Sequence, residues 1–216
     1  LIQNSAKQPT VLEDAFVAVG TVIVALEADF EKYLDAFLPF LVEGLRNHEE
    51  HQLCTISVGI VGDVCRSLAE RATKYSETLV LALFEDLQSP VLHRNVKPHI
   101  LSCFGDIAMA IGPAFESYLP TAMAVLQQAS MVQNAPDTAD YEMVEYVNDL
   151  REGIAEAYVG IVSGFRMAGK ADVLLPYMDY TLAFVGLVAS DSIDRSETLL
   201  RSTIGLVGDL ATAYPT

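Results

Sequence analysis

The sequence has few of the residues and none of the motifs that usually mark an active site. Its 216 residues include no tryptophan, only three cysteines and four histidines, and the cysteines form no CxxC pair. This cysteine pattern argues against a disulfide framework and against a cysteine-ligated zinc site, so buried free thiols are expected. The strings GxGxxG, GxxxxGKS/T, HExxH and GxSxG are missing. We therefore predict no catalytic residue, no metal site, no cofactor and no enzymatic activity.

Basic residues are also scarce. The chain has 13 Lys and Arg against 29 Asp and Glu, a formal charge of −16. Such a surface repels nucleic acid and anionic lipid and attracts basic partners, although it also serves solubility alone. Polar residues interrupt the apolar runs, so neither a signal peptide nor a membrane span is expected. Because the sequence opens on LIQNSAKQP without methionine, we expect a piece of a longer protein.

One string recurs along the chain. Versions of GIVGDVCRSL, or of its apolar positions, occur at residues 18–26, 59–68, 103–108, 160–165 and 205–211. Gly20 precedes Gly62 by 42 residues, and Gly62 precedes Gly105 by 43. A period in the low forties with helical patterning is typical of HEAT and armadillo repeats. The sequence therefore predicts an all-α solenoid of HEAT-type antiparallel helix pairs, with no strand.

The same period divides the chain into about four and a half repeats in a single array. The only long interval runs from Gly105 to Ser163, 58 residues, and an insertion in one turn, residues 131–139, explains most of it. We predict a half repeat at 1–28 and complete repeats at 31–71, 75–111, 115–167 and 172–214. In each complete repeat the first helix is the outer one and the second is the inner one.

The recurring small and acidic residues of the inner helices have a structural explanation. Glycine lets neighbouring helices approach closely, which offsets its helix-propensity cost of about 1 kcal/mol. We expect such contacts at Gly59, Gly62, Ser102, Gly105, Gly160, Gly205 and Gly208. The recurring aspartates, Asp63, Asp106 and Asp209, are expected to bond backbone amides or side chains of the next repeat.

Five carboxylates in the long inner helix of the third repeat follow a 3-4-3-4 spacing and form one stripe. Stacked like charges repel one another by a few tenths of a kcal/mol for each pair. The stripe is therefore either a solvated face or the binding site of a basic segment, and both readings stay open. Its members are Glu142, Glu145, Asp149, Glu152 and Glu156.

The outer helices of the first two complete repeats carry large apolar side chains at helical spacing. Most such residues pack in the core, but grooves between neighbouring outer helices also admit an aromatic side chain of a partner. The candidates for this second role are Tyr33, Phe37, Leu41, Leu79, Leu83 and Phe84.

Long strings of the sequence resemble the importin β family, the karyopherin β nuclear import receptors, and specifically their C-terminal part. Among them are QLCTISVGIVGDVCRSL, HRNVKPHILSCFGDIAMAIG and DYEMVEYVNDLREGIAEAYVGIVSGF, and the resemblance covers residues 11–214. It implies a receptor that shuttles between cytoplasm and nucleus and carries protein cargo through nuclear pores. It also implies that the acidic stripe takes the basic importin-β-binding segment of importin α or basic cargo. The outer-helix grooves would take Phe-Gly nucleoporins.

The resemblance further implies regulation by Ran-GTP, mainly through repeats that this chain lacks. A non-transport HEAT scaffold of the phosphatase-scaffold type, which only organises partner proteins, is the alternative. Such a scaffold would bind no Phe-Gly peptide. Neither interpretation involves a direct contact with nucleic acid or membrane.

Overall fold

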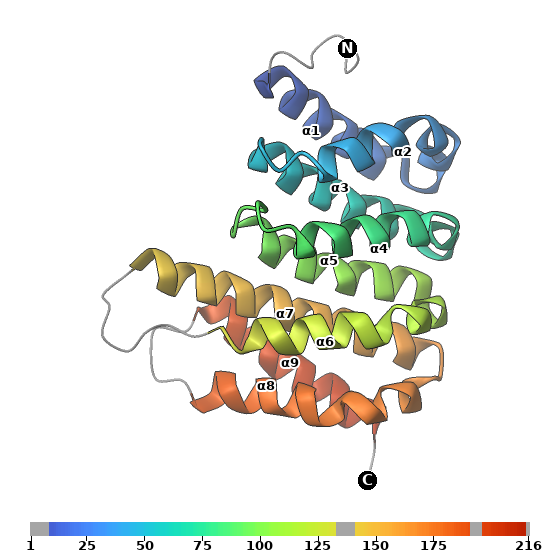
Figure 1. Ribbon diagram of the computed structural model, residues 1–216. Coiled ribbons are helices and arrows are strands. Elements are labelled where there is room, and N and C mark those ends of the chain that lie inside the picture. The colour runs from blue at the N-terminus through green and yellow to red at the C-terminus, as the bar shows by residue number, and fades with distance from the viewer. Residues whose placement is uncertain (1–8, 133–140, 191–195, 215–216) are drawn as a thin grey trace.

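The structure is a computed structural model, and it describes residues 9–132, 141–190 and 196–214. The described residues form helices and turns with no strand among them (Figure 1). The inner helices are α1 (Pro9–Leu26), α3 (His51–Leu68), α5 (Val96–Ile111), α7 (Tyr141–Met167) and α9 (Glu197–Ala213). The outer helices are α2 (Glu31–Leu45), α4 (Thr73–Gln88), α6 (Leu119–Ser130) and α8 (Met178–Ser190).

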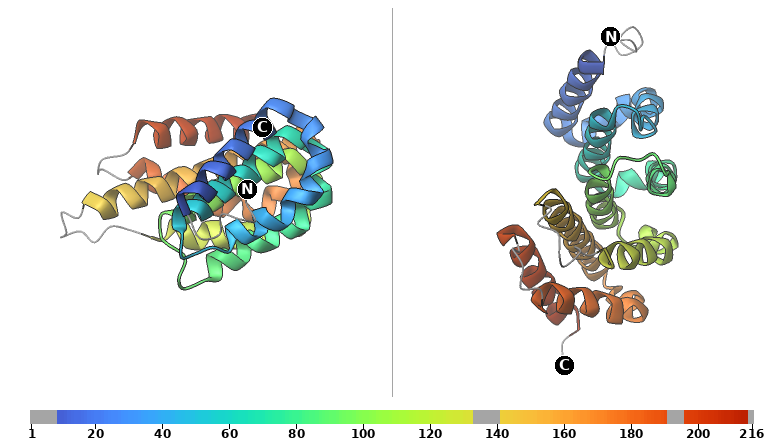
Figure 2. Two further views of the ribbon diagram at one scale, coloured as in Figure 1. Left: turned by 90° about the horizontal axis from the view of Figure 1, so that it is seen from above. Right: turned by 60° about the vertical axis from the view of Figure 1, so that its left-hand side comes forward.

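The helices stack in two layers. Each inner helix contacts the next one, from α1 through α3, α5 and α7 to α9, and the outer helices lie along one side of this stack (Figure 2). Short 3-10 helices at Glu27–Phe30, Ala69–Ala72, Gly112–Ser117 and Ala171–Tyr177 connect each inner helix to the following outer helix. This arrangement confirms the predicted all-α solenoid of antiparallel helix pairs.

Prolines help to determine where several helices begin. An α-helix from residue 93 would place Pro98 at its sixth position, where proline lacks an N–H donor and clashes with the preceding turn. Instead α5 begins at Val96, with Pro98 in its first turn. Likewise α6 begins next to Pro120, and Pro176 lies in the 3-10 helix before α8. The predicted insertion at 131–139 falls, apart from residues 131 and 132, outside the described residues.

The inner helices α5 and α7 approach each other through glycine. A methyl group on Gly105 would lie 2.7 Å from the carbonyl oxygen of Glu156, and one on Gly160 would lie 2.5 Å from the Cα of Gly105. Close packing through small residues is thus confirmed at these two positions. At Gly59, Gly205 and Gly208, by contrast, a methyl group would meet no atom within 4 Å, so the expected contact is wrong for these three.

The recurring aspartates bond arginine side chains. Arg66 of α3 donates to Asp63 at 2.7 Å and also to Asp106 of α5. Arg166 of α7 lies 3.4 Å from Asp209 of α9. Asp106 and Asp209 thus bond an arginine of the preceding repeat, and Asp63 bonds within its own helix, so the expected bond to the next repeat is wrong for these contacts. Because these pairs are partly exposed, each stabilises the fold by at most about 1 kcal/mol.

All three cysteines are buried and free, as predicted. Burial raises the pKa of the Cys54 thiol and of the Cys65 thiol to about 12, and that of Cys103 well above its ordinary value. Because the thiolate is the reactive form, these cysteines are inert in the folded chain.

Two helical stretches are long and apolar enough by composition to cross a membrane, Val96–Ser117 and Ala171–Ser190. The expectation that polar residues interrupt every such run is therefore wrong. Half of the first stretch is buried in the array, and core helices reach the same apolar content, so the signal is weak. Only 22% of the second stretch is buried, which leaves much of the apolar surface of α8 exposed.

Candidate partner-binding surfaces

The acidic stripe (Glu142, Glu145, Asp149, Glu152 and Glu156) lies along the solvent side of α7, between α5 and α9. Four of its carboxylates are exposed and Glu152 is half-buried. The opposite side of α7, with Leu150, Ile154 and Tyr158, is at most 3% exposed and packs in the core. The predicted single stripe of carboxylates on this helix is therefore confirmed.

Neighbouring helices hold three of the stripe carboxylates in place. Ser102 of α5 donates a hydrogen bond of 2.6 Å to Glu156, and Ser196, which caps the N-terminus of α9, donates to Glu152. Serine is neutral, so these bonds orient the carboxylates without cancelling their charge. Arg94, in the turn before α5, forms an exposed ion pair with Glu142 at 3.1 Å.

Asp149, at the middle of the stripe, has a raised pKa. Partial burial raises the pKa of its carboxyl above the ordinary value, and the neighbouring charges of Glu145 and Glu152 raise it further. His99 acts in the opposite direction. A cationic group bound beside Asp149 would relieve this repulsion, because an opposite charge nearby favours the ionised carboxylate.

A groove adjoins the stripe. It has a volume of about 370 Å³ and crosses α3, α5, α7 and α9, with Glu156 at one wall. Met109, which is 49% exposed, and Val159 give it an apolar surface, while Ser102 and Asp106 add polar groups. We call it the inner groove. The sequence signal for it was the set of small residues at Ser102, Gly105 and Gly160, which leave room beside the larger side chains.

The outer-helix candidates lie mostly in the core. Leu41, Leu79 and Leu83 are fully buried, and Phe37 and Phe84 are 8% and 9% exposed. Only Tyr33, at 51%, is exposed. A row of residues four apart turns about 40° around a helix at each step, so Tyr33 lies at the rim of the face whose centre Leu41 occupies. Five of the six residues therefore support the outer surface from below and do not reach a ligand there.

A second groove, which sequence reasoning missed, lies on the outer side of the first two complete repeats. Its volume is about 630 Å³, and its apolar lining comes from Pro39 and Val42 of α2 and from Val91 in the turn after α4. Arg46 and His48 add polar groups to this outer groove. Val91 is 69% exposed. An apolar residue in a polar turn was the one sequence signal available for this site.

His48 connects two turns beside the outer groove. Its Nε2 lies 2.9 Å from the carboxylate of Asp86, and its Nδ1 lies 3.1 Å from the hydroxyl of Ser89. Asp86 is 1% exposed, and this burial raises the pKa of its carboxyl although His48 acts against the shift. His48 is therefore a partner that the buried carboxylate requires.

In the part of the chain that the structure describes, the histidines, cysteines and carboxylates do not converge on a metal site. Within residues 9–132, 141–190 and 196–214, no group of three or more such side chains is arranged to hold a metal ion. His51 and His93 stack with ring centroids 4.4 Å apart, an arrangement that suits packing between turns. The inner groove, the outer groove and the acidic stripe are therefore the candidate binding surfaces of the described residues.

Comparison with known sequences agrees with this description. A family model described as importin subunit beta-1-like, TPR repeats, matches residues 1–216. The chain is 46% identical over 214 residues to importin subunit beta-1 of Schizosaccharomyces pombe, covering 99% of this chain and 25% of the relative. It is 42% identical over 205 residues to importin subunit beta-1 of Arabidopsis thaliana, covering 95% and 23%.

Solved structures give the same result. A crystal structure of importin beta superimposes with a TM-score of 0.91 at 45% identity, over 95% of this chain and 24% of the other. A Kap95:Nup1 complex gives 0.90 at 31% identity, over 99% and 24%. Kap95p in a structure concerned with the switch loops of RanGDP gives 0.88 at 32% identity, over the same shares. The chain spans about a quarter of these relatives, and the matches give no support to its expected place in their C-terminal part.

Proposed function

The chain belongs to the importin subunit beta-1 family, and from this membership we propose that it is a segment of a nuclear transport receptor that carries protein cargo through nuclear pores. In that role it moves between cytoplasm and nucleus. It acts by binding partners along an extended helical surface, and it performs no catalysis. A solenoid suits this task because its successive repeats form one long surface.

The acidic stripe is the observation that carries the proposal. Five carboxylates along one face of α7 repel one another, and two of them are oriented by serine donors that leave their charge intact. A basic segment such as that of importin α, or basic cargo, relieves the repulsion. The inner groove next to Glu156 offers apolar contact to a side chain of the same segment.

Phe-Gly nucleoporins are the second class of partner. A relative that is 31% identical to this chain is known in complex with Nup1, which supports such binding in the family. On this chain we assign the contact to Tyr33 and to the outer groove at Val42 and Val91. The buried candidates shape this surface from beneath: Phe37, Leu41, Leu79, Leu83 and Phe84.

Ran is the third proposed partner. A relative's structure concerns the switch loops of RanGDP, and we propose that Ran-GTP releases cargo mainly through repeats outside this chain. The competing function, a scaffold that only organises other proteins, shares the fold. It requires neither the charge of the stripe nor an apolar ligand in the outer groove.

Titration with a labelled oligoarginine peptide tests the stripe. The triple variant Glu145→Gln, Asp149→Asn and Glu156→Gln should weaken binding about 10-fold, as expected for three nearby charges. Its control removes the same number of charges from outer-layer positions that are also exposed, Glu43, Glu77 and Glu116. The control should change the affinity less than about 2-fold. If both variants lost the same affinity, the stripe would contribute only through the net charge of the chain and would not be a specific binding site.

An FxFG peptide tests the outer groove and separates the receptor from the scaffold. Binding should be saturable and survive physiological salt, because it is apolar. Val91→Asp should weaken it, whereas Val22→Asp, on α1 away from the groove, should not. If Val91→Asp bound the peptide as tightly as the parent chain does, the nucleoporin site would not lie in this groove. If the parent chain did not bind the peptide, the scaffold function would be favoured.

A further inference from the structure

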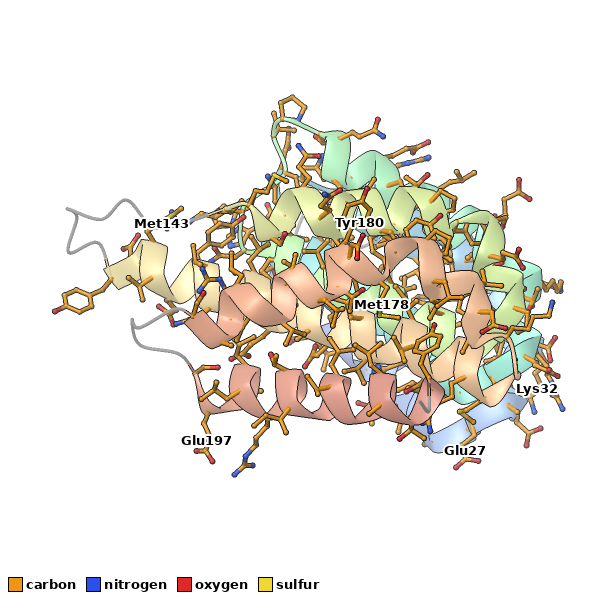
Figure 3. The ribbon with its side chains drawn as sticks, turned by 90° about the horizontal axis from the view of Figure 1, so that it is seen from below. Glu27, Lys32, Met143, Met178, Tyr180 and Glu197 are labelled. Carbon is orange, nitrogen blue, oxygen red and sulfur yellow. The ribbon has the colours of Figure 1, made fainter. Side chains whose placement is uncertain are left out.

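Arg66, on the solvent side of α3, lies between two grooves of the inner layer. It lines the inner groove, and it also lines a second groove of about 320 Å³. We call this second one the Glu27 groove, and its lining residues are Val24, Glu27, Asp63, Arg66 and Ser67. Figure 3 looks along the stack of helices and shows Glu27 and α9, marked by Glu197, at the same edge of the array. Both grooves therefore open on one side, and Arg66 is the residue that their linings share.

Two aspartates hold the guanidinium group of Arg66 between neighbouring repeats. It donates to Asp63 of its own helix at 2.7 Å and also to Asp106 of α5. A methyl group on Gly62 would lie 2.6 Å from Asp106 and 3.1 Å from Arg66, so this glycine leaves the room in which the two side chains meet. The three charged side chains remain accessible, with 54% of Arg66, 27% of Asp63 and 29% of Asp106 exposed. The two aspartates thus bind a guanidinium group at a place that solvent reaches.

The corresponding position of the next repeat has a different side chain. Met109 follows Arg66 by 43 residues, the same step that separates the recurring glycines of α3 and α5. It is 49% exposed, carries no charge and lies in the wall of the inner groove with Glu156. The carboxylate of Glu156 accepts a hydrogen bond from Ser102, a neutral group, so its charge is retained. Along the inner face, Arg66 therefore neutralises carboxylates where the next repeat leaves a carboxylate charged.

We infer that Arg66 is an internal competitor of the basic partner: Asp63 and Asp106 form an arginine site, which the chain's own arginine occupies until an arginine of the partner displaces it. The inference rests on the proposed binding of a basic segment to this face. An arginine of the partner presents the same planar fork to the two carboxylates, so the site that fits Arg66 also fits the partner. Because exposed ion pairs stabilise a fold only slightly, moving Arg66 aside costs little.

Displacement of Arg66 also joins the two grooves. Its side chain belongs to the lining of both, so its departure leaves a continuous path from Glu27 to Glu156. Among the described residues, four carboxylates and one guanidinium group line this path: Glu27, Asp63, Asp106, Glu156 and Arg66. A segment with several cationic side chains therefore complements the path better than a single cation does.

Titration with the same labelled oligoarginine peptide tests the inference. Arg66→Gln should tighten binding about 5-fold, because the arginine site is then vacant in every molecule. Arg71→Gln is the matched control. Arg71 is 62% exposed and lies 3.4 Å from Glu31, so this substitution also removes one positive charge and frees one carboxylate, but Arg71 is not part of the lining of either groove. The control should change the affinity less than about 2-fold.

A second substitution shows whether the gain in affinity comes from the vacated site. Asp106→Asn removes one of the two carboxylates that hold the guanidinium group. In the Arg66→Gln chain it should weaken binding about 5-fold and so cancel the gain. In the parent chain it should weaken binding less than about 2-fold, because Arg66 already occupies the aspartate. Circular dichroism checks that each variant is folded.

The outcomes separate this inference from the proposed function. If the parent chain binds the peptide and the triple variant of the stripe binds it less tightly, the proposed function stands. An unchanged or weaker affinity of Arg66→Gln would then overturn the inference alone, and so would an equal gain in Arg71→Gln, since the gain would come from net charge. If neither the parent chain nor Arg66→Gln bound the peptide, both would be wrong.

Discussion

The inner and outer layers of this solenoid are packed in different ways, although both are made of apolar helices. Between α5 and α7 the backbones meet at Gly105 and Gly160, with no room for a methyl group. The outer helices are held by large side chains such as Leu79, and Gly186 of α8 has open space around it. The inner layer therefore fixes the spacing of the repeats, while the outer layer has freedom to form grooves.

Glycine-to-alanine substitutions should change the stability of the fold in opposite directions in the two layers, and this is the largest difference that we expect between them. Gly160→Ala places a methyl group against the backbone of α5 and should destabilise the fold by about 2 kcal/mol or more, because neither backbone can move away freely. Gly186→Ala meets no atom and should stabilise it by up to about 1 kcal/mol through helix propensity. Urea unfolding measures both. A Gly160→Ala chain as stable as its parent would show that the inner layer is not tightly spaced.

The second test concerns the outer layer alone. Leu79→Ala should lower the free energy of unfolding by about 3 kcal/mol, since Leu79 is fully buried and its removal leaves a cavity. Leu81, on the same helix, is 49% exposed, and Leu81→Ala should change the value by less than about 0.5 kcal/mol. If Leu79→Ala and Leu81→Ala lowered the stability equally in thermal or urea unfolding, the assignment of Leu79 to the core would be contradicted. A weaker FxFG affinity in Leu79→Ala alone would therefore reflect lost stability.

The two layers also differ in how far the sequence predicts them. The inner layer follows from a local string, because Gly105 and Asp106 recur at the repeat period and their neighbours are other copies of the same string. The outer layer was harder to predict, because residues at the same helical spacing differ in burial: Tyr33 is exposed and Leu41 is buried. The outer groove joins Val42 to Val91, which are distant in the sequence, and no periodicity reports such a pairing.

The bond between Ser196 and Glu152 illustrates the same limit on the inner side. The sequence placed Glu152 in the acidic stripe, and the structure confirms that position. It gave no signal that the N-cap of α9 would donate to this carboxylate, because that contact depends on how α7 and α9 are stacked. Residue types and faces are therefore predictable from the period, whereas individual bonds between repeats are not.

Removing His48 tests the connection between two turns of the outer layer. His48→Ala leaves the buried carboxylate of Asp86 without this partner, which should destabilise the fold by about 1–3 kcal/mol. His99→Ala, at an exposed position on α5, should be nearly neutral. Chemical unfolding at pH 7 measures both variants. If the double variant His48→Ala, Asp86→Asn loses as much unfolding free energy as His48→Ala does, the unpaired charge of Asp86 is not the cause of the destabilisation.

The smallest effect is expected in the acidic stripe, where the inner layer faces solvent. The pKa of Asp149 is raised in the folded chain, so the fold binds its proton more tightly than the unfolded chain does. Ionisation of Asp149 therefore destabilises the fold, and this cost is present at neutral pH and disappears as the pH falls through the folded pKa. Since Asp149 is exposed and its charge is screened, Asp149→Asn should stabilise the fold at pH 7 by only a few tenths of a kcal/mol, about the size of one repulsive pair. The gain should vanish in acid, and Glu77→Gln in the outer layer should show none. A loss of stability at pH 7 would mean that the stripe is stabilised within the chain itself and has no need of a cation.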